Sequence, residues 1–405
     1  MSEVGFVKSL LLTLPLAFLC GRALPARFSF AARLVGGLLG GWLVAAALTL
    51  LVPSGLMSYL VSFAIVGSIY AVIALGLNVQ WGYTGLFNIG IAAFFAVGAF
   101  TTALVTTTAP TGVAAGFTQQ VFGLGAPFIV GVAAAGLAAG LLALLVGGPT
   151  LRLREDYLAI ATIGIAETVR LIFQNERWLA NGPQPLRGIP QPLVCLVRDA
   201  GCDWAPAPLA AFFDVLSPRD YTYVYVLITA LFVIGAYLVL ERAIRSPWGR
   251  LLRAVREEED AAAMNGKDVA RVKLQAFTVG AVIMGVGGAL YAHYMVSIDY
   301  SHFDPLYATF LIWVMLMLGG SGNNRGAILG AFVIWGVWTG TAFLVDVMRP
   351  ALAAISPDLP SRGPYLRLMF IAIVLLLILL FRPKGLIGEE RFVSRLSGGR
   401  EQPLP

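Results

Sequence analysis

Charged residues are the scarcest feature of this sequence. Only 12% of its 405 residues are Asp, Glu, Lys or Arg, whereas 58% are hydrophobic and the mean hydropathy is +0.82. Soluble globular domains carry about 25% charged residues, so the composition excludes a water-soluble protein and indicates a polytopic membrane protein. The net charge of +6 is modest. Basic loops that meet anionic lipid explain this charge better than nucleic-acid binding does.

Residues that usually catalyse reactions or hold metals are scarce too. The sequence has two histidines and three cysteines, with no His/Cys cluster at metal-ligand spacing. It has no G-x-x-x-x-G-K-[S/T] phosphate loop, so we expect no ATP hydrolysis and no cofactor on this chain. A membrane enzyme is disfavoured because the sequence offers no constellation of nucleophile, base and metal ligands.

Long apolar runs dominate the sequence instead. A membrane span needs about 20 apolar residues, and the runs predict an all-α fold with 10–11 transmembrane helices. The first run follows Lys8 like a signal peptide but lacks a clean cleavage site, so we interpret it as a retained span. The predicted spans are Phe6–Cys20, Val35–Val52, Leu56–Trp81, Leu86–Val105, Ala126–Gly148, Tyr157–Phe173, Thr222–Leu240, Leu274–Ile298, Leu306–Gly319, Gly326–Val347 and Pro364–Phe381.

One long charged segment interrupts the apolar pattern. Residues Glu241–Lys273 carry eight Lys/Arg and six Asp/Glu between two predicted spans. The Lys/Arg excess close to the span ends predicts that this loop lies in the cytoplasm. Ser246 followed by Pro247 is typical of a helix start, and Gly266 is typical of a helix stop. We therefore expect one short helix that lies along the membrane.

The acidic residues of this loop stand beside small alanines, which suits docking by a soluble partner. A solvated connector is the alternative. The spacing also predicts two i,i+4 ion pairs, Arg253 with Glu257 and Arg256 with Asp260, worth about 0.2–0.5 kcal/mol each. The residues expected to couple this loop to the partner are Arg253, Arg256, Glu257, Glu258, Glu259, Asp260, Ala261, Ala262 and Gly266.

Ionisable residues inside spans are costly and mark functional sites. Glu167 and Arg170 lie clearly inside one span, three residues apart, where they can neutralise each other. They form either an ion pair that fixes helix packing or, through Glu167, part of a transport pathway. His293, which lies between two tyrosines, is interpreted as a packing residue.

A helix break at Gly82–Gly85 is the second candidate for the pathway. Unwound backbone at membrane depth is tolerated only where it is buried in protein or lines a cavity. The glycines of Gly319–Gly322 weakly resemble this stretch. The residues predicted to line the pathway are Asn78, Trp81, Gly82, Tyr83, Gly85, Asn88 and Glu167.

A cytoplasmic loop at 241–273 fixes the expected side of the other loops. The alternation of spans places the basic residues near 22–33, 152–154 and 325 inside, together with the basic tail, and the uncharged segment 106–125 outside. Segment 175–221 then also lies outside, in an oxidising compartment where Cys195 and Cys202 can form a disulfide. Two free thiols are the alternative.

Several stretches resemble LivM-type permeases, which belong to ABC importers of branched-chain amino acids. Asp260–Gly266 is similar to the E-A-A-x-x-x-G loop of ABC-importer permeases, with Asp in place of Glu. Glu155 departs from the usual Gly, and the unfamiliar insert Cys195–Asp214 leaves receptor preference open. The matching stretches, which cover well over half the chain in the expected order, are Leu75–Asn78, Trp81–Gly90, Leu151–Ile160, Leu186–Pro190, Ser246–Arg250, Arg253–Glu257, Gly287–Ala292 and Phe381–Gly388.

The resemblance implies a multi-pass permease subunit in a bacterial inner membrane. It implies a homologous second permease, two ATPase subunits that carry ATP and Mg²⁺, and a periplasmic substrate-binding protein. An importer of urea or short amides is an alternative, and an ion-coupled secondary transporter is a weaker one. The expected organisation is an N-terminal span and linker at 1–34, a permease domain at 35–388 and a cytoplasmic tail at 389–405. The permease domain includes a periplasmic insert at 174–221 and a cytoplasmic coupling loop at 241–273.

Overall fold

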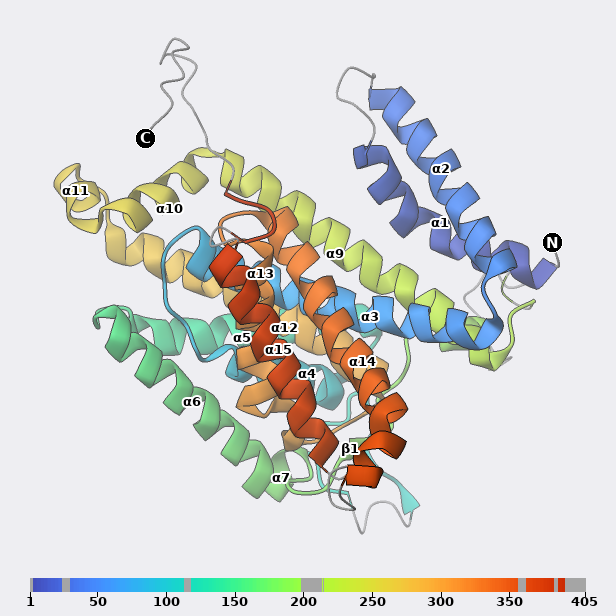
Figure 1. Cartoon of the computed structure of the whole chain (residues 1–405). Coiled ribbons are helices and arrows are strands. Elements are labelled where there is room, and N and C mark those ends of the chain that lie inside the picture. Colours follow the sequence, from blue (N-terminus) through green and yellow to red (C-terminus); the bar gives the residue numbers. More distant parts are fainter. Residues whose placement is uncertain are drawn as a thin grey trace.

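The chain folds into a bundle of helices, as its apolar runs predict (Figure 1). A computed structural model of the protein describes residues 3–23, 30–112, 118–197, 213, 215–355, 362–381 and 385–389. Each predicted span coincides with a helix. The α-helices are α1 (Glu3–Ala23), α2 (Phe30–Leu51), α3 (Ser54–Leu77), α4 (Ile91–Thr106), α5 (Phe128–Thr150), α6 (Glu155–Asn175), α7 (Arg177–Ala180), α9 (Tyr221–Arg245), α10 (Pro247–Glu257), α11 (Glu259–Met264), α12 (Val269–Met295), α13 (Leu311–Gly319), α14 (Asn324–Ile355) and α15 (Gly363–Phe381).

Short elements connect these helices. Two short strands, β1 and β2, pair with each other in antiparallel fashion. The remaining elements are single turns of 3-10 or π-helix. The short elements are β1 (Leu186–Arg187), β2 (Ser297–Ile298), the 3-10 turns η3 (Val194–Leu196), η4 (Pro218–Asp220) and η5 (Tyr300–Phe303), and the π-helical turns η1 (Asn78–Gly82) and η6 (Leu306–Phe310).

The described helices are long and apolar enough for a membrane protein. Five stretches can cross a bilayer by length and composition, and shorter apolar helices occupy several of the other predicted spans. The chain is therefore an all-α protein with several membrane spans. The five long stretches are Ser54–Gly82, Phe128–Thr150, Tyr221–Arg245, Val269–Met295 and Asn324–Pro350.

The bundle packs around α12, which contacts α3, α4 and α5 (Figure 1). Glycines face one another at these contacts. A methyl group on Gly76 of α3 would lie 2.6 Å from the carbonyl oxygen of Gly280, and one on Gly98 of α4 would lie 2.5 Å from the Cα of Gly285. Small residues let helix backbones approach closely in lipid, where van der Waals contact replaces the hydrophobic effect as the main attraction.

Small-residue contacts also hold α14 against α13. A methyl group on Gly326 would lie 2.6 Å from the carbonyl oxygen of Gly319, and one on Gly330 would lie 2.8 Å from the Gly319 nitrogen. Gly326 and Gly330 are four residues apart, so they lie on the same face of α14 and bring its backbone close to α13. Gly336 and Gly340 have the same spacing, but apart from its own helix no described atom lies within 4 Å of a methyl group built on Gly340.

The first predicted span is anchored to the bundle by its lysine. Helices α1 and α2 pack against each other, and α1 also contacts α9. The Nζ of Lys8 lies 2.6 Å from the Oδ1 of Asp220, which directly precedes α9, and 5.1 Å from the ring centroid of Tyr223. Burial raises the pKa of the Asp220 carboxyl, but the hydrogen bonds from Lys8 and Ser217 outweigh burial and leave this pKa below its ordinary value.

The connecting segments gather at two ends of the bundle (Figure 1). At one end, which we call the β end, β1 pairs with β2, and Gln120 bridges to Ala180. At the other, which we call the α10 end, Arg256 of α10 reaches the carbonyl oxygen of Gly82. In these three contacts, the segments that meet are ones expected on the same side of the membrane.

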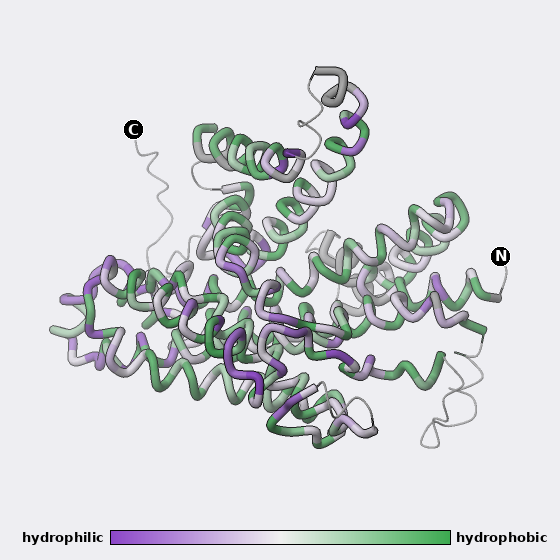
Figure 2. Tube along the Cα trace, turned by 90° about the horizontal axis from the view of Figure 1, so that it is seen from below, coloured by the Kyte–Doolittle hydropathy of each residue, from purple (hydrophilic) through white to green (hydrophobic). Residues whose placement is uncertain are grey.

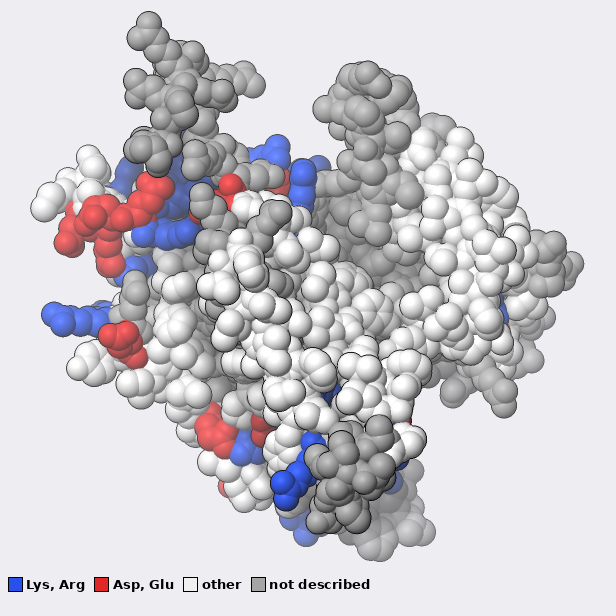
Figure 3. Space-filling view, in the orientation of Figure 1, with Lys and Arg blue, Asp and Glu red and all other residues white. Residues whose placement is uncertain are grey.

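The surface shows the same division. Most of the chain is hydrophobic or intermediate in Figure 2, and hydrophilic residues gather at the left of that view, where α10 and α11 lie, and again near its middle. On the face shown in Figure 3, charged side chains cover α10 and α11 and appear again near α6 and α7. The surface between them is largely uncharged, as the hydrocarbon core of a bilayer requires.

Replacing Asp220 by Asn should weaken the attachment of α1. The change leaves Lys8 half-buried without its counter-charge, so we expect the free energy of unfolding to fall by ~1–2 kcal/mol. Because the folded-state pKa of Asp220 is lowered, this stabilisation is present above the unfolded pKa of about 3.9 and is lost as the pH falls through the folded pKa. Thermal unfolding of the purified protein at several pH values measures both effects.

Asp346 provides the matched control. It pairs with Arg349 on the surface, where both side chains are exposed. Asp346→Asn should therefore change the melting temperature little. Equal losses in the two variants would contradict an anchoring role for Asp220.

Candidate functional site

The helix break predicted near Gly82–Gly85 is present. Helix α3 ends at Leu77 and continues as the π-helical turn η1, and residues 83–90 are not helical. Gly85 has a φ of +77°, a conformation that glycine adopts without strain. The next helix therefore begins at Ile91 and not at Leu86, where the apolar run begins. Backbone groups released by such a break need partners within the protein.

The buried side chain of Asn78 makes hydrogen bonds between this helix break and the segment that follows α13. Its Oδ1 accepts a hydrogen bond from the N–H of Gly322 at 2.9 Å, and its Nδ2 donates to the Oδ1 of Asn324 at 3.0 Å. The glycine-rich segment Gly319–Gly322, which ends α13, therefore lies against the break that ends α3. We call these two interruptions the first break (residues 78–90) and the second break (residues 319–323).

Gln80 and Asn88 hold the first break together from within. The Nδ2 of Asn88 donates to the Oε1 of Gln80 at 2.7 Å, and the Nε2 of Gln80 donates to the carbonyl oxygen of Phe277 on α12 at 2.8 Å. The Oδ1 of Asn88 accepts from the N–H of Gly90 at 2.8 Å. Neither amide side chain has exposed surface, and buried amides require such partners.

Three aromatic rings pack against one another at the first break. The ring centroids of Trp81, Phe87 and Trp313 lie 4.9–5.3 Å apart, and the Nε1 of Trp313 donates to the carbonyl oxygen of Asn88 at 3.0 Å. Trp81 and Phe87 are partly exposed. The structure thus brings six of the seven predicted pathway residues to one place, namely Asn78, Trp81, Gly82, Tyr83, Gly85 and Asn88.

Glu167, the seventh predicted pathway residue, does not lie at the first break but on α6. This helix meets the first break at Thr162, whose Oγ1 accepts from the N–H of Ile89 at 3.1 Å. Glu167 is five residues further along, about 7–8 Å at 1.5 Å per residue. Its Oε2 accepts from the Nε of Arg170 at 2.9 Å, and the guanidinium of Arg170 lies 5.8 Å from the ring centroid of Tyr300. Glu167 is therefore neutralised on its own helix, as its spacing from Arg170 predicts.

The charged loop forms two short helices, so the expectation of one helix from Ser246 to Gly266 is wrong. The start is confirmed, because the Oγ of Ser246 accepts from the N–H of Trp248 and α10 begins at Pro247. Glu258 has extended backbone, with φ −155° and ψ 103°, and separates α10 from α11. Four consecutive acids repel one another in a single helix. The interruption instead places the last two in the first turn of α11, where the helix dipole favours negative charge.

Two of the three arginines of α10, Arg253 and Arg256, contact backbone carbonyls. The Nε and Nη2 of Arg253 donate to the carbonyl oxygens of Gly249 and Ile244, both at 3.2 Å, and tie α10 to the end of α9. The Nη1 of Arg256 donates to the carbonyl oxygen of Gly82 at 2.5 Å. Arg256 forms its ion pair with a carboxylate of the C-terminal segment and, among the described residues, not with the acid four residues later.

Acidic and apolar groups are exposed where α10 meets α11. The side chains of Glu257–Asp260 and of Ala261 are exposed, and Met264 is 89% exposed. We call these residues the docking surface. Ala262 is buried beneath it and packs α11 against the protein, whereas Gly266 ends α11 with a φ of +72°. The predicted coupling residues therefore divide into an exposed set and a set that holds the loop in shape.

Two predictions concern residues near the β end. His293 is fully buried, with its Nδ1 2.7 Å from the carbonyl oxygen of Pro190 and its Nε2 3.1 Å from the Oγ1 of Thr102. A carbonyl can only accept, so Nδ1 carries the hydrogen and Nε2 accepts from the Thr102 hydroxyl, which fits a packing role.

Cys195 is disulfide-bonded. Cys202 lies outside the described residues, so the pairing of these two cysteines stays a prediction.

Comparison with known proteins shows the family. Residues 59–379 match the family described as "Branched-chain amino acid transport system / permease component". The chain belongs to this permease family. It is 30% identical over 347 residues to the high-affinity branched-chain amino acid transport system permease protein LivM of Salmonella typhimurium, covering 84% of this chain and 72% of that protein.

Further relatives show the same likeness. The Escherichia coli permease of the same name is 30% identical over 346 residues, with the same shares of the two chains. The probable branched-chain amino acid transport permease protein LivM of Methanocaldococcus jannaschii is 28% identical over 355 residues, which cover 80% of this chain and 92% of that one. No solved structure matches the chain.

Sequence reasoning missed four residues that assemble the permease's two breaks. Gln80 and Asn324 carry amides within or beside apolar runs, the same signal that identified Asn78 and Asn88. Trp313 looks like ordinary apolar packing in the sequence. Glu389 lies beyond the last span, where nothing in the sequence indicates a partner.

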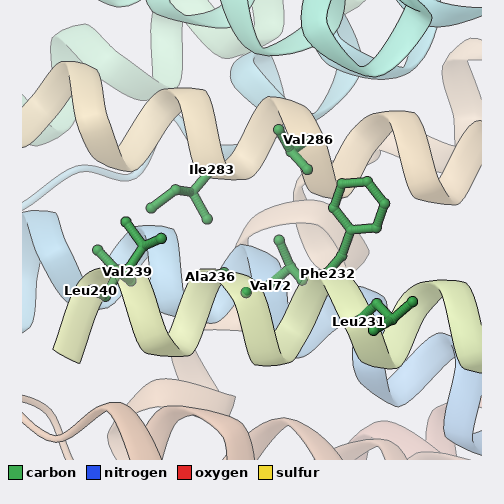
Figure 4. A pocket seen from close by; sticks show the side chains of 9 residues that line it. Val72, Leu231, Phe232, Ala236, Val239, Leu240, Ile283 and Val286 are labelled. Carbon is green, nitrogen blue, oxygen red and sulfur yellow. The ribbon is translucent and has the colours of Figure 1, made fainter. Parts of the chain in front are cut away.

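An apolar groove lies between α9 and α12 (Figure 4). Its volume is about 470 Å³, and side chains of both helices point into it, with Val72 of α3 beside them. The lining side chains offer no hydrogen bond, so the groove suits an apolar group such as a lipid chain and not the charged ends of an amino acid. The lining residues are Val72, Leu231, Phe232, Gly235, Ala236, Val239, Leu240, Ile283 and Val286.

Replacing Gly82 by Ala should disturb the contact between the two breaks. A methyl group there would lie 2.6 Å from the Gly322 nitrogen and would collide with the side chain of Asn78. We expect the free energy of unfolding to fall by ~1–3 kcal/mol, as overpacking in a well-packed core typically costs. Thermal unfolding of the purified permease measures this change.

Gly164→Ala is the matched control. Gly164 lies in α6, and apart from its own helix no described atom comes within 4 Å of a methyl group built on it. Alanine is the better helix former, so this variant should be neutral or slightly stabilised. A Gly82→Ala protein that melts at the temperature of the Gly164→Ala protein would contradict a close contact between the breaks.

Proposed function

We propose that the chain is the membrane permease subunit of an ATP-driven importer of branched-chain or related neutral amino acids. Its family and the names of its relatives support the substrate class. The observation that carries the mechanism is the contact of Arg256 with Gly82, because it joins the docking surface to a break between two spans. A bundle with few charges also suits a small cargo without net charge.

In this proposal the α10 end faces the cytoplasm of a bacterium. The Lys/Arg excess of residues 241–273, close to the ends of α9 and α12, supports this orientation. The β end then faces the periplasm, where a substrate-binding protein delivers the amino acid. The basic residues at the α10 end also contact the anionic lipid heads of the inner membrane.

The docking surface receives an ATPase subunit. Its exposed acids offer charge complementarity to a basic partner, and exposed Met264 and Ala261 add an apolar contact. The likeness of Asp260–Gly266 to the E-A-A loop of importer permeases supports the same role. ATP and Mg²⁺ bind on two such ATPase subunits, and a homologous second permease completes the transporter.

The first break forms part of the substrate pathway. Its partly exposed Trp81 and Phe87 suit the side chain of an apolar amino acid, and the buried amides beside them hold the backbone in shape. Closure of the ATPase dimer moves α10, and Arg256 passes this movement to the first break. The spans then change between outward-open and inward-open states.

An ion-coupled secondary transporter is supported less well. Such a protein needs a carboxylate inside the membrane that can take up a proton or a cation. Glu167 is already paired with Arg170. Urea and short amides stay possible cargoes within the same class of importer, and competition for uptake between leucine, isoleucine, valine and urea separates them.

Replacing the four acids Glu257–Asp260 by lysines should abolish substrate-stimulated ATP hydrolysis. The reversed charge repels the basic partner. All four side chains are exposed, and the ion pair that the variant loses is that of Glu259 with Lys273, so the bundle should stay folded. ATP hydrolysis by the complex reconstituted in liposomes, with and without the loaded binding protein, measures this effect.

Asp156→Lys is the control, because Asp156 is exposed in the first turn of α6, outside the docking surface and away from the β end. It should leave the stimulation unchanged. Full stimulation in the four-lysine variant would contradict the docking role.

A further inference from the structure

A short C-terminal segment is bound to the second break. Residues 385–389, which we call the C-terminal clasp, follow the last helix. The N–H groups of Leu386 and Ile387 donate to the last carbonyl oxygens of α13 at 2.8 and 3.0 Å. The Nδ2 of Asn323 donates to the carbonyl oxygen of Gly388 at 3.0 Å. The clasp thus satisfies carbonyl groups that the end of α13 leaves free.

Arg256 joins this clasp to the first break. Its Nη1 donates to the carbonyl oxygen of Gly82 at 2.5 Å and lies 2.8 Å from the Oε1 of Glu389. Its Nη2 donates to the Oε2 of Glu389 at 3.3 Å. A two-point contact between guanidinium and carboxylate fixes the orientation of the side chain as well as its position. One residue of α10 therefore contacts the first break directly and the second through the clasp.

A second set of contacts reaches the same place from α9. The Oε2 of Glu241 accepts from the Nδ2 of Asn324 at 3.3 Å, and Asn324 accepts from Asn78. Asn78 in turn binds Gly322. Both helices that lead toward the docking surface are thus hydrogen-bonded to the breaks.

We propose that Arg256 is the positioning residue that couples movement of α10 to the two breaks, and that the C-terminal clasp, through Glu389, holds Arg256 on Gly82. This inference rests on the proposed function, because it takes α10 and α11 to receive the ATPase subunit. Arg256 lies on the last turn of α10, next to the docking surface, so a displacement of that surface displaces its guanidinium. The hydrogen bond to Gly82 then moves the backbone of the first break.

Transport by the assembled importer in liposomes tests this role. In Arg256→Gln, the ATPase subunits should still co-purify and hydrolyse ATP, but leucine uptake per ATP should fall about tenfold or more, as the loss of a charge-assisted hydrogen bond in the transmitting contact implies. Arg256→Lys keeps a cationic donor and should retain more uptake than the glutamine variant. Glu389→Gln should lie between wild type and Arg256→Gln.

A charge swap separates the two contacts of Arg256. In the double variant Arg256→Glu, Glu389→Arg, an ion pair can form again, but position 256 can no longer donate to the carbonyl of Gly82. Uptake per ATP should therefore stay low. Full recovery in the swap, or unchanged uptake per ATP in Arg256→Gln, would overturn the proposal. Arg242→Gln, an exposed arginine on α9, is the control and should match wild type.

Hydrogen exchange measured by mass spectrometry on the same complexes gives a readout independent of transport. Arg256→Gln and Glu389→Gln should speed exchange in peptides that cover residues 82–86 and 386–387, and Arg242→Gln should not. Faster exchange in these peptides supports the link of Arg256 and Glu389 to the two breaks, whether or not the complex imports leucine. If the complex does not import leucine, the proposed function fails but this link stands. Unchanged exchange in Arg256→Gln would overturn the link itself.

Discussion

Every helix that stops within a membrane protein leaves polar backbone groups that lipid cannot satisfy, and the α10 end of this permease is organised by that constraint. Helices α3 and α13 both stop there. Asn78 serves the two breaks at once, since it binds the N–H of Gly322 and the side chain of Asn324. Buried amides, neighbouring backbone groups and Arg256 bind the interrupted backbone, so the breaks are ordered parts of the bundle.

The same constraint joins the breaks to the docking surface. The carbonyl oxygen of Gly82 takes its donor from Arg256 on α10, and the end of α13 takes its donors from the C-terminal clasp. Satisfying the backbone therefore creates a mechanical connection between the docking surface and the spans. The proposed transport cycle needs such a connection, because energy released on a soluble subunit has to reach helices that the subunit does not contact.

The sequence predicts the parts of this structure that depend on local patterns. Apolar runs locate the helices because a span must be apolar along its length, and Ser246–Pro247 predicts the start of α10 because a cap acts within one turn. The pairing of Asn78 with Asn324 joins residues 246 positions apart, and that of Arg256 with Glu389 joins residues 133 positions apart. No local pattern determines which distant polar group a buried amide or an arginine meets. The interruption at Glu258 is not predicted for another reason. The expectation of one helix rests on its start and stop signals and takes no account of the repulsion among four neighbouring acids.

That interruption decides how force can travel through the loop. Extended backbone at Glu258 separates α11 from α10, so the two helices need not turn together. In the proposed cycle, movement of α11 reaches α12 through the ion pair of Glu259 with Lys273, and movement of α10 reaches the breaks through Arg256. Arg253 binds α10 to the end of α9, so α9 must follow α10. In the proposed cycle, movement of the docking surface then reaches the breaks by two routes. One passes directly through Arg256, and the other passes through Glu241 and Asn324. Both routes end at Asn78 and its neighbours.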